Sequence, residues 1–147
     1  MLEKPFCLNP CTEGVISSPN HPDSYPYYLM KTQTIKVEPG LVVSLQFTAF
    51  DIERCSSPIS GACACDHLTM TDGDGTTLME KNCGYTLPGP ITSKSNIVNF
   101  FFSTDSDNDD TMTGWSVSWS AVTPGESLAY SQADQQRPQH MSKKARL

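Results

Sequence analysis

Apolar and polar residues alternate with a period of two along much of the chain. The segment 115–121, WSVSWSA, places two tryptophans, a valine and an alanine on one face and three serines on the other. In the segment 41–49, LVVSLQFTA, five apolar side chains from Leu41 to Ala49 share one face in the same way. This alternation is typical of antiparallel strands that bury one face.

Further segments are expected to be strands of the same kind. Segments 33–37 and 67–71 alternate over shorter lengths, and 97–103, IVNFFFS, is apolar enough to be a central strand. Turn sequences rich in Pro, Gly, Asn and Asp separate them, at 18–22, 38–40, 72–75 and 87–90. Because no long helical stripe interrupts this pattern, the sequence predicts an all-β antiparallel sandwich.

The pattern ends near Val122, which closes the last expected strand. We therefore expect one domain at residues 1–123 and a polar, disordered tail at 124–147, rich in Gln and Ser. No apolar run reaches the roughly 18 residues of a membrane-spanning helix. The start, MLEKPFCLNP, lacks the apolar core of a signal peptide, so a secreted protein with this sequence would be a mature form or a fragment.

Charge is distributed unevenly along the chain. The formal net charge is −6, and residues 1–123 carry six basic and fourteen acidic side chains, a charge of −8. Nucleic acid is an unsuitable partner, because its binding needs a basic surface that releases counterions. An acidic body instead favours basic partners or bound cations.

Six cysteines in a chain of this size indicate disulfides and an oxidising, extracellular compartment. The alternative is a zinc site, which typically repeats the spacing C-x2-C. The short spacings here are Cys7-x3-Cys11 and Cys63-x-Cys65, and only three histidines are available. Disulfides are the better interpretation.

An acidic stretch, STDSDNDDTMTGW at 103–115, holds four carboxylates within six residues. A helical calcium loop requires Gly at its sixth position and Glu at its twelfth. Counted from Asp105, those positions are Asp110 and Ser116, and the flanking segments are expected strands. The remaining alternatives are a solvated loop and a metal site whose other ligands lie elsewhere.

Two more acids sit at expected strand ends. Glu53 follows the strand that begins at 41, and Asp66 precedes the strand at 67–71. If both strands belong to one sheet, these two side chains emerge at the same end of the sandwich, where Asp105 arrives after 97–103. Calcium takes six to eight oxygen ligands, which carboxylates from separate loops, carbonyls and water would supply.

Several motifs in order make the chain resemble a CUB domain over about residues 7–122. They are GVISSPNHPDSYP at 14–26, LQFTAFDIE at 45–53, CACDHL at 63–68, DG at 72–73, CG at 83–84, ITSKSN at 91–96, FSTD at 102–105 and GW at 114–115. The resemblance implies a jelly-roll-like β-sandwich that acts outside the cell.

The resemblance also implies a calcium site. In calcium-binding members, three acids of these motifs ligate Ca²⁺, and they correspond to Glu53, Asp66 and Asp105. A tyrosine that supports the cluster corresponds to Tyr25. A backbone carbonyl and an Asn or Ser side chain from the acidic loop correspond to Asp107 and Asn108, while Asp109 and Asp110 are expected to face water.

The cysteines depart from the family pattern at one point. Lys31 stands where most CUB domains have the second cysteine, so the first family disulfide is absent. The second family disulfide corresponds to Cys63–Cys83. The other four cysteines allow three pairings; we favour Cys7–Cys11 and Cys55–Cys65, which close short loops, over pairing between the N-terminal segment and the 55–65 loop.

The sequence carries no catalytic motif such as HExxH, GxSxG or a P-loop, so the residues alone indicate no enzymatic activity. The expected function is therefore the one that the resemblance implies. CUB domains of complement proteases, tolloid-like proteases, neuropilins and spermadhesins bind proteins and sometimes glycans. We expect a non-catalytic, Ca²⁺-dependent recognition module whose acidic ligands engage a partner's Lys or Arg, with Tyr27 and Tyr28 as added contact area. The alternatives are an accessory C-terminal domain of a secreted protease of the astacin or serine type and a spermadhesin-like glycan-binding protein. Homo-oligomer formation stays open.

Overall fold

The computed structural model describes residues 12–55, 63–106 and 111–125. These residues form eight strands, and they contain no helix that is long and apolar enough to cross a membrane. The strands are β1 (Glu13–Ser17), β2 (Met30–Lys36), β3 (Val42–Asp51), β4 (His67–Asp72), β5 (Thr77–Asn82), β6 (Ile91–Thr92), β7 (Ile97–Ser103) and β8 (Gly114–Val122). The all-β prediction is confirmed.

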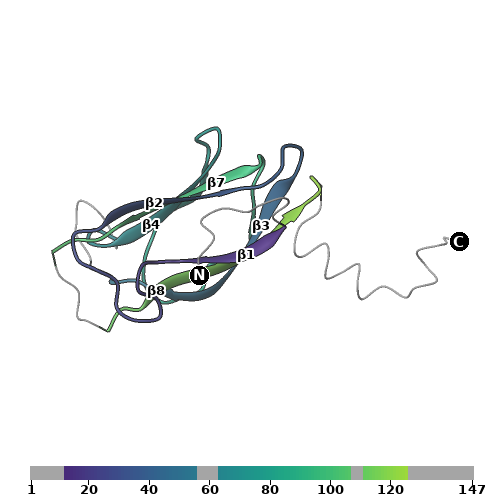
Figure 1. Ribbon diagram of the computed structural model, residues 1–147. Coiled ribbons are helices and arrows are strands. Elements are labelled where there is room, and N and C mark those ends of the chain that lie inside the picture. The colour runs from purple at the N-terminus through teal and green to yellow at the C-terminus, as the bar shows by residue number, and fades with distance from the viewer. Residues whose placement is uncertain (1–11, 56–62, 107–110, 126–147) are drawn as a thin grey trace, which may run out of the picture.

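The strands form two antiparallel sheets that pack face to face (Figure 1). One sheet has the order β1-β8-β3-β6, and the other has the order β2-β7-β4-β5. The strand at 97–103, expected to be central, lies between β2 and β4. Its inward side chains are fully buried, as a strand with neighbours on both sides requires.

An aromatic cluster joins the two sheets in the core. Phe100 of β7 stacks on Trp115 of β8 with ring centroids 5.1 Å apart, and Phe102 meets the same Trp115 edge to face. Tyr25, from the loop between β1 and β2, packs its ring edge against Phe102 at 4.9 Å. These contacts anchor the end of the sandwich at which Tyr25 also presents its hydroxyl.

The alternation along β3 is broken by a register shift between Phe47 and Ala49. The odd-numbered residues face the core up to Phe47, after which Phe50 and Ile52 are the buried ones. The expectation that Ala49 shares the inward face is therefore wrong at this position. A bulge adds one residue to one strand, so it exchanges the two faces beyond it.

Three short strands have no counterpart in the sequence-based expectations: β1, β5 and β6. Each lies at the edge of its sheet. Their side chains are exposed or only partly buried, so these strands lack the alternation that reveals a half-buried strand.

Candidate metal centre

Strand pairing brings two of the predicted ligands together. In the sheet that contains β4 and β7, His67 pairs with Ser103, so Asp66 lies beside the residues that follow β7. The backbone amide of Asp105 donates a hydrogen bond to Asp66 Oδ1 at 2.8 Å. Residues 39 positions apart in the sequence are thereby fixed next to each other.

Glu53 reaches the same place from the opposite sheet. The strands before Glu53 and after Asp66 do not share one sheet, which was the condition considered from the sequence, because β3 and β4 belong to different sheets. Beyond β3 the chain crosses between the sheets, where Ile52 forms a bridge with Gly84. Carboxylate oxygens of Glu53 and Asp105 lie within 4.8 Å of each other.

Tyr25 connects the segment that carries Glu53 with the segment that carries Asp66. Its hydroxyl donates a hydrogen bond to Asp66 Oδ2 at 2.7 Å and accepts one from the backbone amide of Glu53 at 2.9 Å. The tyrosine is only 2% exposed, and burial is the main reason that its pKa lies far above the ordinary value. It therefore stays neutral and acts as a fixed donor to Asp66.

Asp66 is completely buried, and its pKa is raised. Burial is the largest cause, and it outweighs the hydrogen bonds from Tyr25 and from the Asp105 amide, which favour the charged form. The nearby charge of Asp105 raises the pKa further. A cation at this position would stabilise the ionised carboxylate, because it would replace the lost hydration.

Two disulfides hold the loop that carries Asp66. They are Cys55–Cys65 and Cys63–Cys83, the pairings favoured from the sequence. The sulfur of Cys65 lies within 4.8 Å of the Glu53 and Asp105 oxygens, but a disulfide sulfur is not a thiolate ligand. Cys7 and Cys11 lie outside the described residues, so their pairing stays a prediction.

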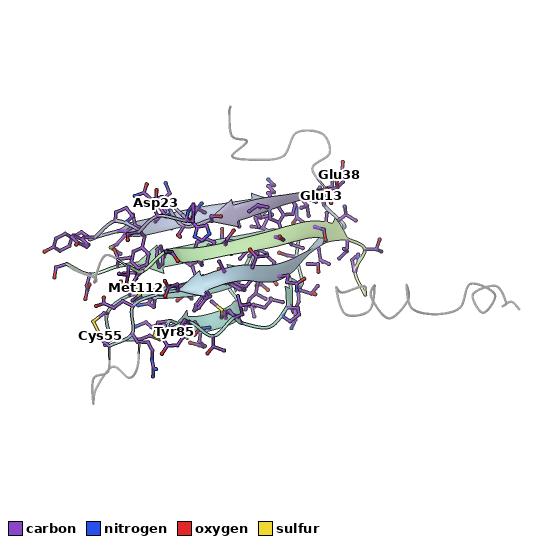
Figure 2. All side chains as sticks on the ribbon, turned by 90° about the horizontal axis from the view of Figure 1, so that it is seen from below. Glu13, Asp23, Glu38, Cys55, Tyr85 and Met112 are labelled. Atoms are coloured by element: carbon purple, nitrogen blue, oxygen red, sulfur yellow. A yellow bond between two sulfur atoms is a disulfide. The ribbon has the colours of Figure 1, made fainter. Side chains whose placement is uncertain are left out.

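The far end of the acidic loop is tied to the same region. Asp51 Oδ2 accepts hydrogen bonds from the amide and the hydroxyl of Thr113, and His21 Nδ1 lies 2.8 Å from the Thr113 carbonyl oxygen. Figure 2 shows Cys55 and Met112 at one end of the sandwich and Glu13 and Glu38 at the other. Asp107 and Asn108 lie outside the described residues, and their role as ligands stays a prediction.

The carboxylates of Glu53 and Asp105 suit a hard cation, whereas Asp66 is not in the group of side chains whose ligand atoms all lie within 4.8 Å of one another. Two oxygens that bind one Ca²⁺ at 2.3–2.6 Å can be at most about 5 Å apart, and the Glu53–Asp105 separation satisfies this limit. The carboxylates offer only oxygen, whereas structural zinc sites are dominated by thiolate and imidazole ligands. Sequence reasoning missed one supporting residue, Thr104, whose hydroxyl links the loop before β2 to the strand end before Asp105.

Comparison with known proteins places this geometry in a family. The family model described as "CUB domain" matches residues 10–119. Human cubilin is 35% identical over 94 residues, which cover 64% of this chain and 2% of cubilin. Tolloid-like protein 1 of Mus musculus is 41% identical over 95 residues, which cover 63% of this chain and 9% of that protein.

Solved structures agree with these matches. The structure titled "Crystal structure of the MASP-1 CUB2 domain bound to Ca2+" superposes with a TM-score of 0.64 at 31% identity, covering 74% of this chain and 92% of that one. This chain thus spans a small part of the long relatives and almost all of an isolated domain. The match over residues 10–119, together with the two-sheet fold, shows that the chain belongs to the CUB domain family.

Proposed function

We propose that this CUB domain is a calcium-binding module for protein recognition outside the cell. The observation that carries the proposal is the buried carboxylate of Asp66, joined through Tyr25 to Glu53 and through a backbone amide to Asp105. The Ca²⁺-bound MASP-1 domain supports it, since that structure shares the fold at 31% identity.

In this proposal Glu53, Asp66 and Asp105 are the protein ligands from three separate segments, and Tyr25 orients two of them. Asp107 and Asn108 complete the set with a carbonyl and a side-chain oxygen. Bound calcium supplies positive charge that holds these segments in one arrangement. Oxygens left facing outward then accept charge-assisted hydrogen bonds from a partner's Lys or Arg.

The compartment and the domain limits belong to the same proposal. Disulfides such as Cys63–Cys83 persist in oxidising compartments, which supports secretion. Residues 1–123 form the non-catalytic recognition domain, and residues 124–147 form a separate polar tail. A larger parent protein is a second candidate context, because the matched region makes up only 2% of cubilin and 9% of tolloid-like protein 1.

The test is thermal unfolding with and without calcium. A ligand that binds only the folded state raises the melting temperature, by an amount that grows with its concentration. We expect this rise with Ca²⁺ for the parent protein and its loss in Asp105→Ala. Glu38→Ala is the matched control, because Glu38 is exposed at the opposite end of the sandwich (Figure 2). An identical calcium response in Asp105→Ala and the parent would refute the site.

The wider context needs a separate measurement. The mass of the native protein, detected in extracellular fluid by an antibody to this domain, distinguishes a single domain from a larger parent. A pull-down from the same fluid with calcium or with EGTA then tests whether partner binding requires the metal.

A further inference from the structure

The segment that leads into β2 is fastened to the end of β7 by four hydrogen bonds. The hydroxyl of Thr104 donates to the Pro26 carbonyl at 2.9 Å and accepts from the Leu29 amide at 2.8 Å. The Thr104 amide donates to the Leu29 carbonyl at 2.9 Å, and the Tyr28 amide donates to the Asp105 carbonyl at 2.8 Å. The backbone of Tyr28 is therefore held directly against a proposed calcium ligand.

Tyr28 adopts a backbone conformation that tyrosine rarely adopts. Its φ is +53°, in the left-handed region that favours Gly, Asn and Asp. Nevertheless its side chain is 77% exposed, so packing in the core does not explain the choice of residue. Strained residues of this kind concentrate where a side chain serves binding.

The segment that contains Tyr28 carries a second exposed apolar side chain, and its backbone is hydrogen-bonded to an acidic residue. Met30, two residues later, is 86% exposed at the start of β2. On the other side of the Tyr28 hydrogen bond lies Asp105, whose carboxylate oxygen is within 4.8 Å of one from Glu53. An apolar surface that borders carboxylates is complementary to a cationic side chain with an apolar neighbour.

We propose that Tyr28 and Met30 form the apolar half of the partner-binding surface, beside the carboxylates of Glu53 and Asp105. The partner is a peptide segment in which a Lys or Arg directly adjoins an aromatic or long aliphatic residue. The basic side chain meets the carboxylates, and its neighbour packs on the Tyr28 ring. This inference rests on the proposed calcium site, because the metal orders the half that receives the cation.

A matched pair of tyrosines allows a sharp test. Tyr28 and Tyr85 have the same exposed fraction, 77%, but Tyr85 follows β5 and is not part of the hydrogen bonds to residues 104–105. Tyr28→Asn removes the ring, keeps the amide that bonds Asp105 and places a residue that tolerates positive φ. We therefore expect this variant to fold and to keep the calcium-dependent rise in melting temperature.

The probes are three immobilised hexapeptides, GGKFGG, GGKSGG and GGSFGG, compared at equal density in saturating calcium. The parent protein should bind GGKFGG about threefold to tenfold more tightly than GGKSGG, as expected for one aromatic contact. Tyr28→Asn should lose this preference and still bind GGKSGG, whereas Tyr85→Asn should keep the preference. GGSFGG should bind more weakly than either lysine peptide in all three proteins.

The outcomes separate the two proposals. If the parent shows the calcium-dependent rise but binds GGKFGG no better than GGKSGG, or if Tyr28→Asn keeps the preference, the role of Tyr28 is refuted while the metal site stands. If the parent shows no calcium-dependent rise, both proposals fail. Absence of any binding to GGKFGG by a calcium-stabilised parent also refutes the proposed partner.

Discussion

Each end of β4 has an aspartate, and the two are almost equally buried, but their pKa values shift in opposite directions. Asp66 immediately precedes the strand and Asp72 ends it, and their exposed fractions are 0% and 1%. The pKa of Asp66 is raised, whereas the pKa of Asp72 is lowered. Burial alone therefore does not determine the state of a carboxylate in this sandwich.

The difference lies in the donors that surround each side chain. Burial by itself would raise the pKa of Asp72, but hydrogen bonds from the Ser95 hydroxyl and from the amides of Lys94, Gly73 and Ser95 lower it overall. At Asp66 the two hydrogen bonds from Tyr25 and the Asp105 amide do not outweigh burial. A carboxylate satisfied by the protein is structural, whereas one short of positive surroundings is suited to a cation.

The largest expected effect on stability comes from replacing Asp72, at the end of β4. Asp72→Ala would leave the amides of Lys94 and Ser95 without their acceptor and would take one of two acceptors from the Gly73 amide and the Ser95 hydroxyl, so we expect it to lower the free energy of unfolding by about 3 kcal/mol. The loss should be the same with and without calcium. Urea denaturation of the variant and the parent measures it, and a loss that depends on calcium would break the comparison.

Replacing Asp66, before the start of β4, should change stability by an amount that depends on calcium. Asp66→Asn removes a buried charge and keeps an oxygen for the Asp105 amide, but its side-chain nitrogen cannot accept from the Tyr25 hydroxyl, so without calcium we expect a loss of stability of about 1–2 kcal/mol. At a calcium concentration 100 times the Kd, the parent gains about 2.7 kcal/mol, which the variant should not gain. A variant that is equally stabilised by calcium would remove Asp66 from the ligand set.

Tyr25→Phe tests the connection between the ligands with a smaller change. Loss of the hydroxyl leaves the Glu53 amide without that acceptor, which should lower the free energy of unfolding by about 1–2 kcal/mol. Supporting residues of metal sites typically contribute tenfold or more to affinity, so calorimetry should show calcium binding weakened by about tenfold. Tyr85→Phe, at an exposed tyrosine, should change neither quantity.

The smallest effect is the dependence of stability on pH. Because the pKa of Asp72 is lowered, its stabilisation is present above the ordinary value of 3.8 and is lost as the pH falls through its folded pKa. For Asp66 the raised pKa reverses the sign: without calcium, its stabilisation is present below 3.8 and is lost as the pH rises through the folded pKa.

Two amide variants separate these contributions. Relative to the parent, Asp72→Asn should flatten the stability curve below about pH 4, and Asp66→Asn should flatten it above that value. Denaturation between pH 3 and 7 in EGTA measures both curves, and flattening in the same pH range would contradict the assignment.

Much of the fold could be predicted because the strongest strands are half-buried. The alternation of β8 indicated its buried face, and the apolar run of β7 indicated a central strand. Prediction failed for strands with little buried surface and at a bulge. The edge strands β1, β5 and β6 show too little burial to leave a pattern, and the bulge near Thr48 exchanged the faces of β3 without a local signal.

For this protein, the sequence by itself determined the all-β class, the CUB family motifs and the set of acidic residues at strand ends. Only the tertiary structure decided that β3 and β4 lie in different sheets, that Tyr28 is held against Asp105, and that Asp66 and Asp72 differ. The reason is physical. The pKa of each carboxyl depends on donors from distant segments, Tyr25 for Asp66 and Ser95 for Asp72, and those contacts exist only once the sheets are packed together.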